Sequence, residues 1–342
     1  MARKTRHNEI VTPELLAQIN SENTKLLDEF VNYLRSLQRS NATIEQYVYD
    51  IRIAFVWNLQ FNNNKFFVEW TKRNVVAYQN WLLNTNGNSP ARVRRLKASL
   101  SSLSNFIENV MDDEFPQFRN IINKIESPVN QPVREKSVFT DEEIVPLLNK
   151  LTELKQYDKA CLIALAYCSG RRKSELVRFK VSDFGDDHLV CNGALYKSDP
   201  IKTKGRGVNG KMLNCFTLAK QFKPYFDNWM ADREQNGIKS IWLFPDINNP
   251  EEHMKTSRIN SWVDTINNKY LSTTLYMHSL RHAIVGRFKK AGIPDSVIKQ
   301  YIGWEDISMV SVYNDLGADE ELSMYFTNNG IATNQQKGFD EI

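Results

Sequence analysis

A polar stretch with two prolines, ESPVNQPVREKS at residues 126–137, divides the 342-residue sequence into two parts with different patterns. The stretch has no apolar periodicity, which is typical of a linker between domains. The part on either side is long enough to bury a core of its own. We therefore expect flexible tails at 1–20 and 326–342, domains at 21–126 and 139–325, and a linker at 127–138.

The part before the linker has the pattern of a helical bundle. Apolar residues recur at helical spacing from Ser21, and again from Thr43, which stands three residues before Gln46 as in a capping box. A third helix is expected over 75–83, and a fourth begins after Ser89, a good N-cap residue that precedes a proline. These segments predict an all-helical N-terminal domain.

The fourth helix carries a group of cations near its start and no acidic residue from Ser89 to Phe106. Such a group is either a solvated helix face or a surface that approaches DNA phosphates. The formal net charge of +4 adds little to this choice, because many proteins that bind no nucleic acid reach it. The candidate DNA contacts on this helix are Arg92, Arg94, Arg95 and Lys97.

The part after the linker mixes helical and strand patterns. Thr140 and Glu143 have capping-box spacing at the start of a helix that Pro146 should shorten or kink, and a buried helix should end near Gly170. Short segments of strand character, separated by Gly, Asn and Asp, predict a small antiparallel sheet. They cover residues 188–196, 200–207 and 211–218. Helical patterns return from about Ala219, so the expected fold class is mainly α, with a mixed α+β C-terminal domain.

Composition disfavours several classes of protein. The longest clearly apolar stretch, CLIALAYC at 161–168, is too short to span a membrane, and no apolar segment follows the basic N-terminus as in a secretory signal. The four cysteines show no C-x-x-C spacing, so we expect reduced thiols, a cytoplasmic location and no metal site. The sequence also lacks the glycine-rich phosphate loop that would imply ATP.

The stretch HSLRH at 278–282 gathers charge at the start of a predicted helix. His278 and Arg281 stand three residues apart and therefore share a helix face. Arginine offers a planar fork of donors and histidine can carry a proton near neutral pH, so the pair suits a phosphate group. Taken alone, the same stretch also fits a solvated basic helix, and His282, on another face, fits a packed histidine.

Four separated segments together resemble the tyrosine recombinase (phage integrase) family. SGRRKSEL at 169–176 is similar to the family's G-x-R-x-S-E-L, HSLRH to its H-x-L-R-H, and GWEDISMVSVY at 303–313 to its G-(H/W)-x8-Y ending, while IKTKGRG at 201–207 resembles its lysine hairpin. The family's catalytic set falls on Arg172, Glu175, Lys204, His278, Arg281, Trp304 and Tyr313, with Lys202 as the alternative lysine. Trp304, in place of a histidine, is most similar to the Cre-type site-specific recombinases.

The resemblance spans roughly residues 20 to 325 and implies that the N-terminal bundle is a SAM-like core-binding domain. One position departs from the family's pattern. Arg171 stands beside Arg172, where family members usually have an apolar residue. We expect Arg171 to reach the DNA backbone or solvent.

The resemblance implies site-specific recombination through a covalent 3′-phosphotyrosine and a Holliday junction. Tyr313 would attack the DNA phosphate, His278 would accept its proton, and Lys204 would protonate the leaving 5′ oxygen. Arg172 and Arg281 would stabilise the charge that develops on the phosphate. No metal, ATP or other cofactor is expected.

Two further residues have supporting roles in this comparison. Trp304 would donate its indole N–H beside the phosphate, and Glu175 would orient neighbouring groups. A type IB topoisomerase has similar chemistry and is the first rival function. A DNA-binding protein without catalysis is the second.

The partners implied by the family are duplex DNA with an inverted-repeat site and further copies of the chain. Family members form a dimer on each site and a tetramer at synapsis. The segment ADEELSMYFTNNGI, at 318–331, is expected to dock on a neighbouring subunit, with an intramolecular helix as the alternative.

Overall fold

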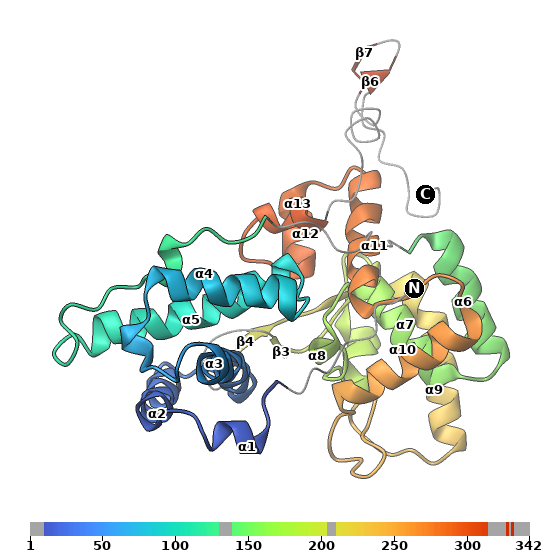
Figure 1. Ribbon diagram of the computed structural model, residues 1–342. Coiled ribbons are helices and arrows are strands. Elements are labelled where there is room, and N and C mark those ends of the chain that lie inside the picture. The colour runs from blue at the N-terminus through green and yellow to red at the C-terminus, as the bar shows by residue number, and fades with distance from the viewer. Residues whose placement is uncertain (1–9, 130–138, 204–209, 314–325, 328–329, 332–342) are drawn as a thin grey trace. The chain divides into compact units, whose positions relative to one another are not determined.

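The computed structural model describes residues 10–129, 139–203, 210–313, 326–327 and 330–331 (Figure 1). These residues form two compact units, one from the described residues up to 129 and one from those beginning at 139. The predicted linker at 127–138 contains the gap between them, and the catalytic-lysine candidate Lys204 lies outside the described residues.

The first unit is helical, as expected. Its α-helices are α1 (Pro13–Leu16), α2 (Ser21–Ser36), α3 (Asn41–Phe61), α4 (Lys72–Asn80) and α5 (Pro90–Val110). Two short 3-10 helices, η1 (Phe67–Glu69) and η3 (Ile122–Lys124), and a π-helical turn, η2 (Trp81–Thr85), complete it. The apolar faces of α2, α3 and α5 meet in one core that includes Phe30, Ile51, Phe55, Leu96 and Leu100.

The ends of these helices show where local sequence signals were sufficient. The Ser89 hydroxyl accepts the backbone N–H of Arg92 at 3.3 Å with proline as the next residue, which confirms the predicted start of α5. For α3 the prediction was wrong by one turn, because Ser40 caps the helix and its hydroxyl accepts the N–H of Thr43 at 3.3 Å. Ser and Thr are both good caps, so propensity alone did not separate them.

The expected flexible N-terminal tail was also wrong for its second half. Helix α1 lies within it, and Ile10, Val11 and Ile19 pack against the helical core. The side-chain amide of Asn64 donates to the carbonyl of Gln18 at 2.8 Å, which ties the segment to the end of α3. Too few apolar residues stand at a regular period here to reveal this packing in the sequence.

The second unit is built around a helix that is buried on all sides. Helix α7 (Tyr157–Ser169) contains the CLIALAYC stretch and packs against α6 (Asp141–Glu153), α9 (Ala219–Gln235) and α11 (Met277–Lys290). An all-round apolar helix is expected at the centre of a domain. The remaining helices are α8 (Lys173–Leu176), η4 (Val181–Phe184), η5 (Asp186–His188), α10 (Thr256–Tyr270), α12 (Asp295–Ile302) and α13 (Ser308–Tyr313).

Two predictions about the helix ends in this unit have clear outcomes. The backbone N–H of Thr140 donates to Glu143 Oε2 at 3.2 Å, which confirms the capping box at the start of α6. Helix α6 then continues through Pro146 to Glu153, so the expected shortening did not occur.

The strands are short and antiparallel, as predicted, but they form separate sheets. Strands β1 (Leu189–Val190), β2 (Leu195–Lys197) and β5 (Phe216–Leu218) form one sheet in that order, and β3 (Ile201–Thr203) pairs with β4 (Lys211–Leu213). Near the C-terminus, β6 (Phe326–Thr327) pairs with β7 (Gly330–Ile331). Phe326, expected at the start of the C-terminal tail, lies in a strand, while residues 314–325 lie outside the described residues. Within the described residues, no helix is long and apolar enough to cross a bilayer.

Candidate active site

A glycine at the end of α7 shapes the centre of the site. Gly170 has a φ of 61°, in the left-handed region, and caps α7. A Cβ atom at this position would lie 2.7 Å from Ile302 Cδ1 and 2.8 Å from Ile284 Cγ2. Both the backbone conformation and the space therefore require glycine. The chain turns here, so Arg171 and Arg172 follow directly after a buried helix.

Arg281, on α11, is anchored to this turn. Its Nη1 donates to the carbonyl of Gly170 at 2.8 Å, and only 1% of the residue is exposed. Burial, and next the charge of Arg172, lower the pKa of Arg281 to about 10, so the guanidinium remains charged at neutral pH. Its Nε and Nη2 are buried without a hydrogen-bond partner among the described residues. Buried donors of this kind are uncommon and suit an anion that binds there.

Arg172 is held by Glu175 one helical turn away. Its Nη1 lies 3.1 Å from Glu175 Oε1, and its backbone N–H donates to Glu175 Oε2 at 3.0 Å. Glu175 is buried, whereas about a third of the Arg172 side chain is exposed (33%). Glu175 therefore fixes the Arg172 guanidinium through Nη1, while part of the Arg172 side chain stays accessible to a ligand.

Tyr313, the last residue of α13, contacts His278 at the start of α11. The hydroxyl oxygen lies 2.7 Å from His278 Nε2, a hydrogen-bond distance. Burial lowers the pKa of His278, and the nearby charges of His282, Arg281 and Arg172 lower it further. The imidazole is therefore neutral at pH 7 and can accept a proton from the hydroxyl.

The Trp304 ring packs against the ring of Tyr313. The two ring centroids are 4.8 Å apart, and Arg281 Cζ lies 5.1 Å from the centroid of the Trp304 ring. The buried indole Nε1 has no hydrogen-bond partner among the described residues. Together with the two unpaired nitrogens of Arg281, this leaves three buried N–H groups at one place.

His282 contacts the same tyrosine from α11. Its ring stacks on that of Tyr313 with centroids 4.4 Å apart and planes at 30°, and it meets His278 edge-on at 5.6 Å. The sequence indicated a packed histidine at this position. It gave no sign that the packing partner is Tyr313, because the two residues are 31 positions apart (313 − 282) in the chain.

The structure contradicts the expectation for Arg171. This residue is 2% exposed, and its guanidinium donates to the carbonyls of Tyr301 and Ile302 at the end of α12. It therefore satisfies backbone carbonyls that the helix leaves unpaired, and it does not reach solvent. The next residues, Gly303 and Trp304, leave α12 beside this contact, so Arg171 supports the position of Trp304.

The lysine assignment stays a prediction. Lys204 lies outside the described residues, and Lys202 is exposed on β3, opposite Met212 of β4. The antiparallel pair β3 and β4 is the kind of hairpin in which the family carries its lysine.

The cations of α5 are less exposed than their sequence suggested. Lys97 is 3% exposed, and its ammonium donates to Gln79 Oε1 at 2.7 Å and to the carbonyl of Ile125 at 2.8 Å. Burial, and next the charge of Arg94, lower its pKa. The expectation of a DNA contact at Lys97 was therefore wrong for this conformation. Arg94 is exposed and donates to the carbonyl of Pro128 at 3.1 Å.

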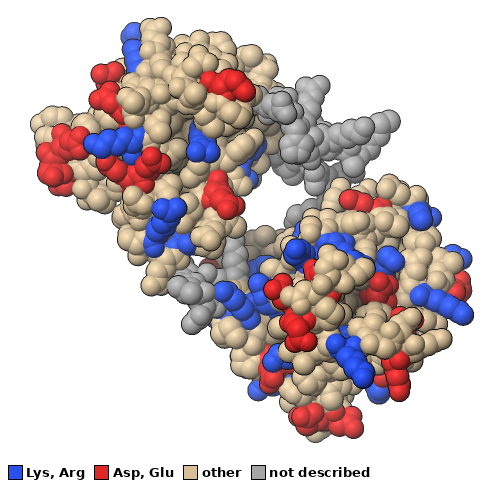
Figure 2. Space-filling view, turned by 90° about the horizontal axis from the view of Figure 1, so that it is seen from below, with Lys and Arg blue, Asp and Glu red and all other residues tan. Residues whose placement is uncertain are grey.

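The remaining two cations of α5 pair with an acid on α3. Arg92 Nη1 and Arg95 Nη2 lie 3.0 Å and 2.9 Å from Asp50 Oδ1. The absence of acids from Ser89 to Phe106 therefore did not mean that the arginines of α5 are unpaired. Acidic and basic side chains both occur across the face seen in Figure 2, so net charge alone does not locate a DNA-binding surface.

One group of possible metal ligands occurs within the described residues. The ligand atoms of Asp183, His188 and Asp199 lie within 4.8 Å of one another. Both carboxylate oxygens of Asp183 already accept backbone N–H groups, from Lys180 at 2.7 Å and from Asp199 at 2.8 Å. These bonds satisfy the buried carboxylate within the protein itself.

Comparison with known families agrees with this geometry. The model of the phage integrase family matches residues 137–320, and the model of the phage integrase N-terminal SAM-like domain matches residues 26–117. The chain belongs to the phage integrase family. The match to the second model also confirms the expected SAM-like fold of the N-terminal unit.

Relatives of this integrase-family protein occur in several bacteria. It is 26% identical over 321 residues to the SPbeta prophage-derived recombinase-like protein YomM of Bacillus subtilis, covering 91% of this chain and 92% of the relative. It is 22% identical over 304 residues to a tyrosine recombinase of Thermosipho africanus, covering 87% and 96%.

Two solved structures have a similar fold. The Tn1549 transposon integrase in complex with circular intermediate DNA matches with a TM-score of 0.63 and 15% identity, covering 88% of this chain and 97% of that one. A lambda integrase dimer bound to a COC′ core site matches with a TM-score of 0.61 and 16% identity, covering 89% and 81%. At these identities the likeness shows a shared fold.

Proposed function

We propose that this integrase-family protein is a site-specific DNA recombinase that cuts and rejoins DNA strands through a covalent bond to Tyr313. The observation that carries the proposal is the hydrogen bond between the Tyr313 hydroxyl and His278, at 2.7 Å, beside three buried N–H groups that have no partner among the described residues. A nucleophile, a base and donors for an anion are the parts that phosphoryl transfer requires.

In the first step the Tyr313 oxygen attacks the phosphorus of a DNA phosphodiester. A phenol is mostly protonated at neutral pH, so His278 Nε2 accepts its proton as the new P–O bond forms. The bond from phosphorus to the 5′ oxygen breaks, and Lys204 gives that oxygen a proton. The products are a 3′-phosphotyrosine and a free 5′ hydroxyl.

The second step reverses the first with a different strand. A 5′ hydroxyl attacks the phosphotyrosine and gives its proton to Lys204, the bond to Tyr313 breaks, and His278 returns the proton to the phenol. Bond energy is kept in the phosphotyrosine, so the balance of the two steps needs neither ATP nor an oxidant. Exchange of one pair of strands in this way gives a Holliday junction, and exchange of the second pair resolves it.

Arg172, Arg281 and Trp304 would hold the phosphate. The two guanidinium groups supply charge and forked donors for the non-bridging oxygens, and the Trp304 indole supplies a neutral donor. Losing one such donor commonly costs about 2.7 to 4 kcal/mol of transition-state stabilisation. In this proposal Glu175 and Arg171 act indirectly, since Glu175 contacts Arg172 and Arg171 supports the segment that bears Trp304.

The assembly in this proposal is a dimer on each inverted-repeat site and a tetramer at synapsis, with duplex DNA as the substrate. One similar structure is a lambda integrase dimer bound to a COC′ core site, and another is XerH bound to palindromic difH substrate. The proposed trans-docking segment at 318–331 is mostly outside the described residues.

A single experiment separates the proposal from its two rivals. The purified protein is incubated with a supercoiled plasmid that carries two copies of the target site, and with a matched plasmid that carries none. A recombinase rearranges the first plasmid and leaves the second supercoiled. Efficient relaxation of the plasmid without sites would favour a type IB topoisomerase, and binding without any strand breakage would favour a non-catalytic protein.

A further inference from the structure

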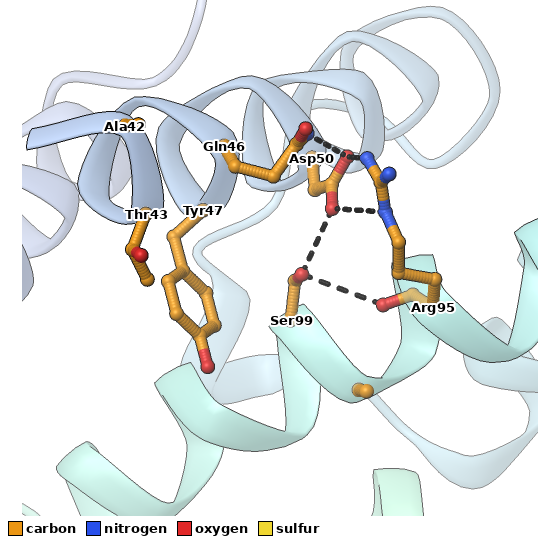
Figure 3. Close-up of a pocket in the computed structure, with 8 residues that line it drawn as sticks. Ala42, Thr43, Gln46, Tyr47, Asp50, Arg95 and Ser99 are labelled. Carbon is orange, nitrogen blue, oxygen red and sulfur yellow. Dashed lines mark hydrogen bonds and ion pairs between the residues drawn. The ribbon is translucent and has the colours of Figure 1, made fainter. Parts of the chain in front are cut away.

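A shallow pocket lies between α3 and α5 of the first unit (Figure 3). Its volume is about 370 Å³, and its lining includes Thr43, Gln46, Tyr47, Asp50 and Arg95. Figure 3 shows the Tyr47 side chain extending toward α5, on the opposite side of the pocket from the bonded side chains of Asp50 and Arg95. The pocket is lined mainly by polar side chains that come from two helices.

Asp50 is the centre of this arrangement. Its Oδ1 accepts from Gln46 Nε2 at 3.0 Å and from Arg95 Nη2 at 2.9 Å, and its Oδ2 accepts from Arg95 Nε at 3.2 Å and from Ser99 Oγ at 3.0 Å. Arg92 Nη1 adds an ion pair at 3.0 Å. A carboxylate has about four lone-pair sites, so this one is saturated. Asp50 is 1% exposed and is therefore not itself available to a ligand.

Two of the residues that bind Asp50, Gln46 and Arg95, are exposed and are held in fixed orientations. Arg95 is bound as a fork through two nitrogens while 48% of its side chain remains exposed. Its third nitrogen, Nη1, has no hydrogen bond to another described residue. The amide nitrogen of the exposed Gln46 is used on Asp50, so its carbonyl oxygen is the end left for a ligand. Asp50 therefore orients two exposed side chains at the pocket, one with a donor and one with an acceptor that Asp50 does not use.

This pattern fits a base-pair edge better than a phosphate. A phosphate needs donors and positive charge only, and a carboxylate beside the cations weakens its binding. The edge of a base pair in the major groove presents donors and acceptors at fixed positions, and Arg and Gln are common partners for it. The Asp50 carboxylate adds no attraction to DNA. Its contribution is to fix the orientation of Arg95 and Gln46.

We propose that Asp50 is a positioning residue that orients Arg95 and Gln46 to read base pairs in the major groove of duplex DNA. The inference rests on the proposed function and adds the residues that determine its choice of sequence. The alternative is that Asp50 only braces α3 against α5. A brace affects stability and the binding of all sequences equally, whereas a reader affects the preference for one sequence over another.

The test starts from a pool of DNA duplexes with a randomised central segment. Duplexes are selected with the wild-type protein, and affinity is then measured for a selected duplex and for a scrambled duplex of the same composition, over a range of salt. The variants are Asp50→Asn and Arg95→Lys. The control is Arg52→Lys, an exposed arginine on the same helix, two residues and about 200° around from Asp50.

The proposal makes opposite predictions for the two duplexes. Asp50→Asn removes a negative charge, so it binds the scrambled duplex several-fold more tightly, with a salt slope steeper by about one, but its preference for the selected duplex falls by about tenfold or more. Arg95→Lys keeps the charge and the salt slope and loses the fork, so the same preference falls by about tenfold. Arg52→Lys changes neither quantity.

Three results would overturn the proposal. If Asp50→Asn raises the affinity for the selected and the scrambled duplex equally, Asp50 is a simple source of repulsion and the proposal fails. If thermal melting shows that Asp50→Asn is unfolded, Arg95→Lys decides, and an unchanged preference in that variant rejects the reading role. A wild-type protein that selects no sequence also rejects it, and the formation of a covalent DNA adduct by the same protein would show that the proposed function still stands.

Discussion

The Tyr313 hydroxyl lies 2.7 Å from His278 Nε2 although the two residues come from different helices, α13 and α11. Trp304 and His282 contact the tyrosine ring from two directions and hold it in place. A nucleophile positioned against its base in this way loses little freedom when substrate binds.

The pH dependence of DNA cleavage should reflect the lowered pKa of His278. The base must be neutral to accept the tyrosine proton, and burial together with His282, Arg281 and Arg172 moves its pKa below the ordinary value of about 6.5. The cleavage rate should therefore rise with pH and then level off, and the midpoint of the rise should lie below about pH 6.5. Single-turnover cleavage of a nicked target duplex measures this profile, and a midpoint well above neutrality would exclude His278 as the base.

Substituting Arg281 should reduce cleavage much more than DNA binding. Arg281→Lys keeps a positive charge but loses the fork that leaves Nε and Nη2 available beside the site. We expect the single-turnover rate to fall by about 10²–10³-fold, as for loss of one preorganised donor, with little change in affinity for DNA. Thermal melting is the necessary control because Arg281 is buried. A variant that is folded and cleaves at the wild-type rate would contradict the phosphate-binding role.

Gly170→Ala should destabilise the second unit more than a matched glycine substitution. Gly193 also has a positive φ, of 84°, but a Cβ atom there would meet nothing within 4 Å, so Gly193→Ala isolates the backbone cost of roughly 1–2 kcal/mol. At Gly170 the contacts with Ile302 and Ile284 add overpacking of about 1–3 kcal/mol. Denaturant unfolding of both variants measures the difference. Equal losses would show that the contacts around Gly170 relax freely.

We expect His282 to support cleavage by stacking its aromatic ring on Tyr313 and not by transferring a proton. His282→Phe keeps an aromatic face against Tyr313, whereas His282→Ala removes the stack of 4.4 Å. Aromatic pairs contribute roughly 0.5–1.5 kcal/mol, so cleavage by the alanine variant should fall by up to about tenfold and recover in the phenylalanine variant. Failure of both variants to the same extent would instead indicate that the imidazole itself is required.

Much of the candidate site could be predicted from the sequence because several of its residue pairs lie only three positions apart on one helix. His278 and Arg281 share a helix face at a separation of three, and Arg172 and Glu175 meet at the same separation in the structure. Gly170 and Ser89 also acted as the helix-end signals that their types suggest. The role of each catalytic candidate stays a proposal, as does Lys204 as the general acid.

Other parts could not be predicted because they depend on contacts between distant segments. Arg171 and Arg172 are neighbours of the same type, and only the turn at Gly170 sends one into the interior and the other toward the site. Asp50 lies 45 residues from Arg95, so the acid-free stretch from Ser89 to Phe106 gives no sign of the partner of Arg95. Lys97 is buried by the chain around Ile125, which lies 28 residues away in the sequence.

The most direct test of the central claim is a covalent trap. A target duplex with a nick close to the cleavage position loses its short 5′-hydroxyl fragment after the first step, so the phosphotyrosine cannot be reversed and the adduct resists SDS. We predict that the wild-type protein forms this adduct, that peptide mapping places the DNA on Tyr313, and that Tyr313→Phe binds the duplex but forms no adduct. An adduct that persists in Tyr313→Phe, or that maps to another residue, would contradict the account.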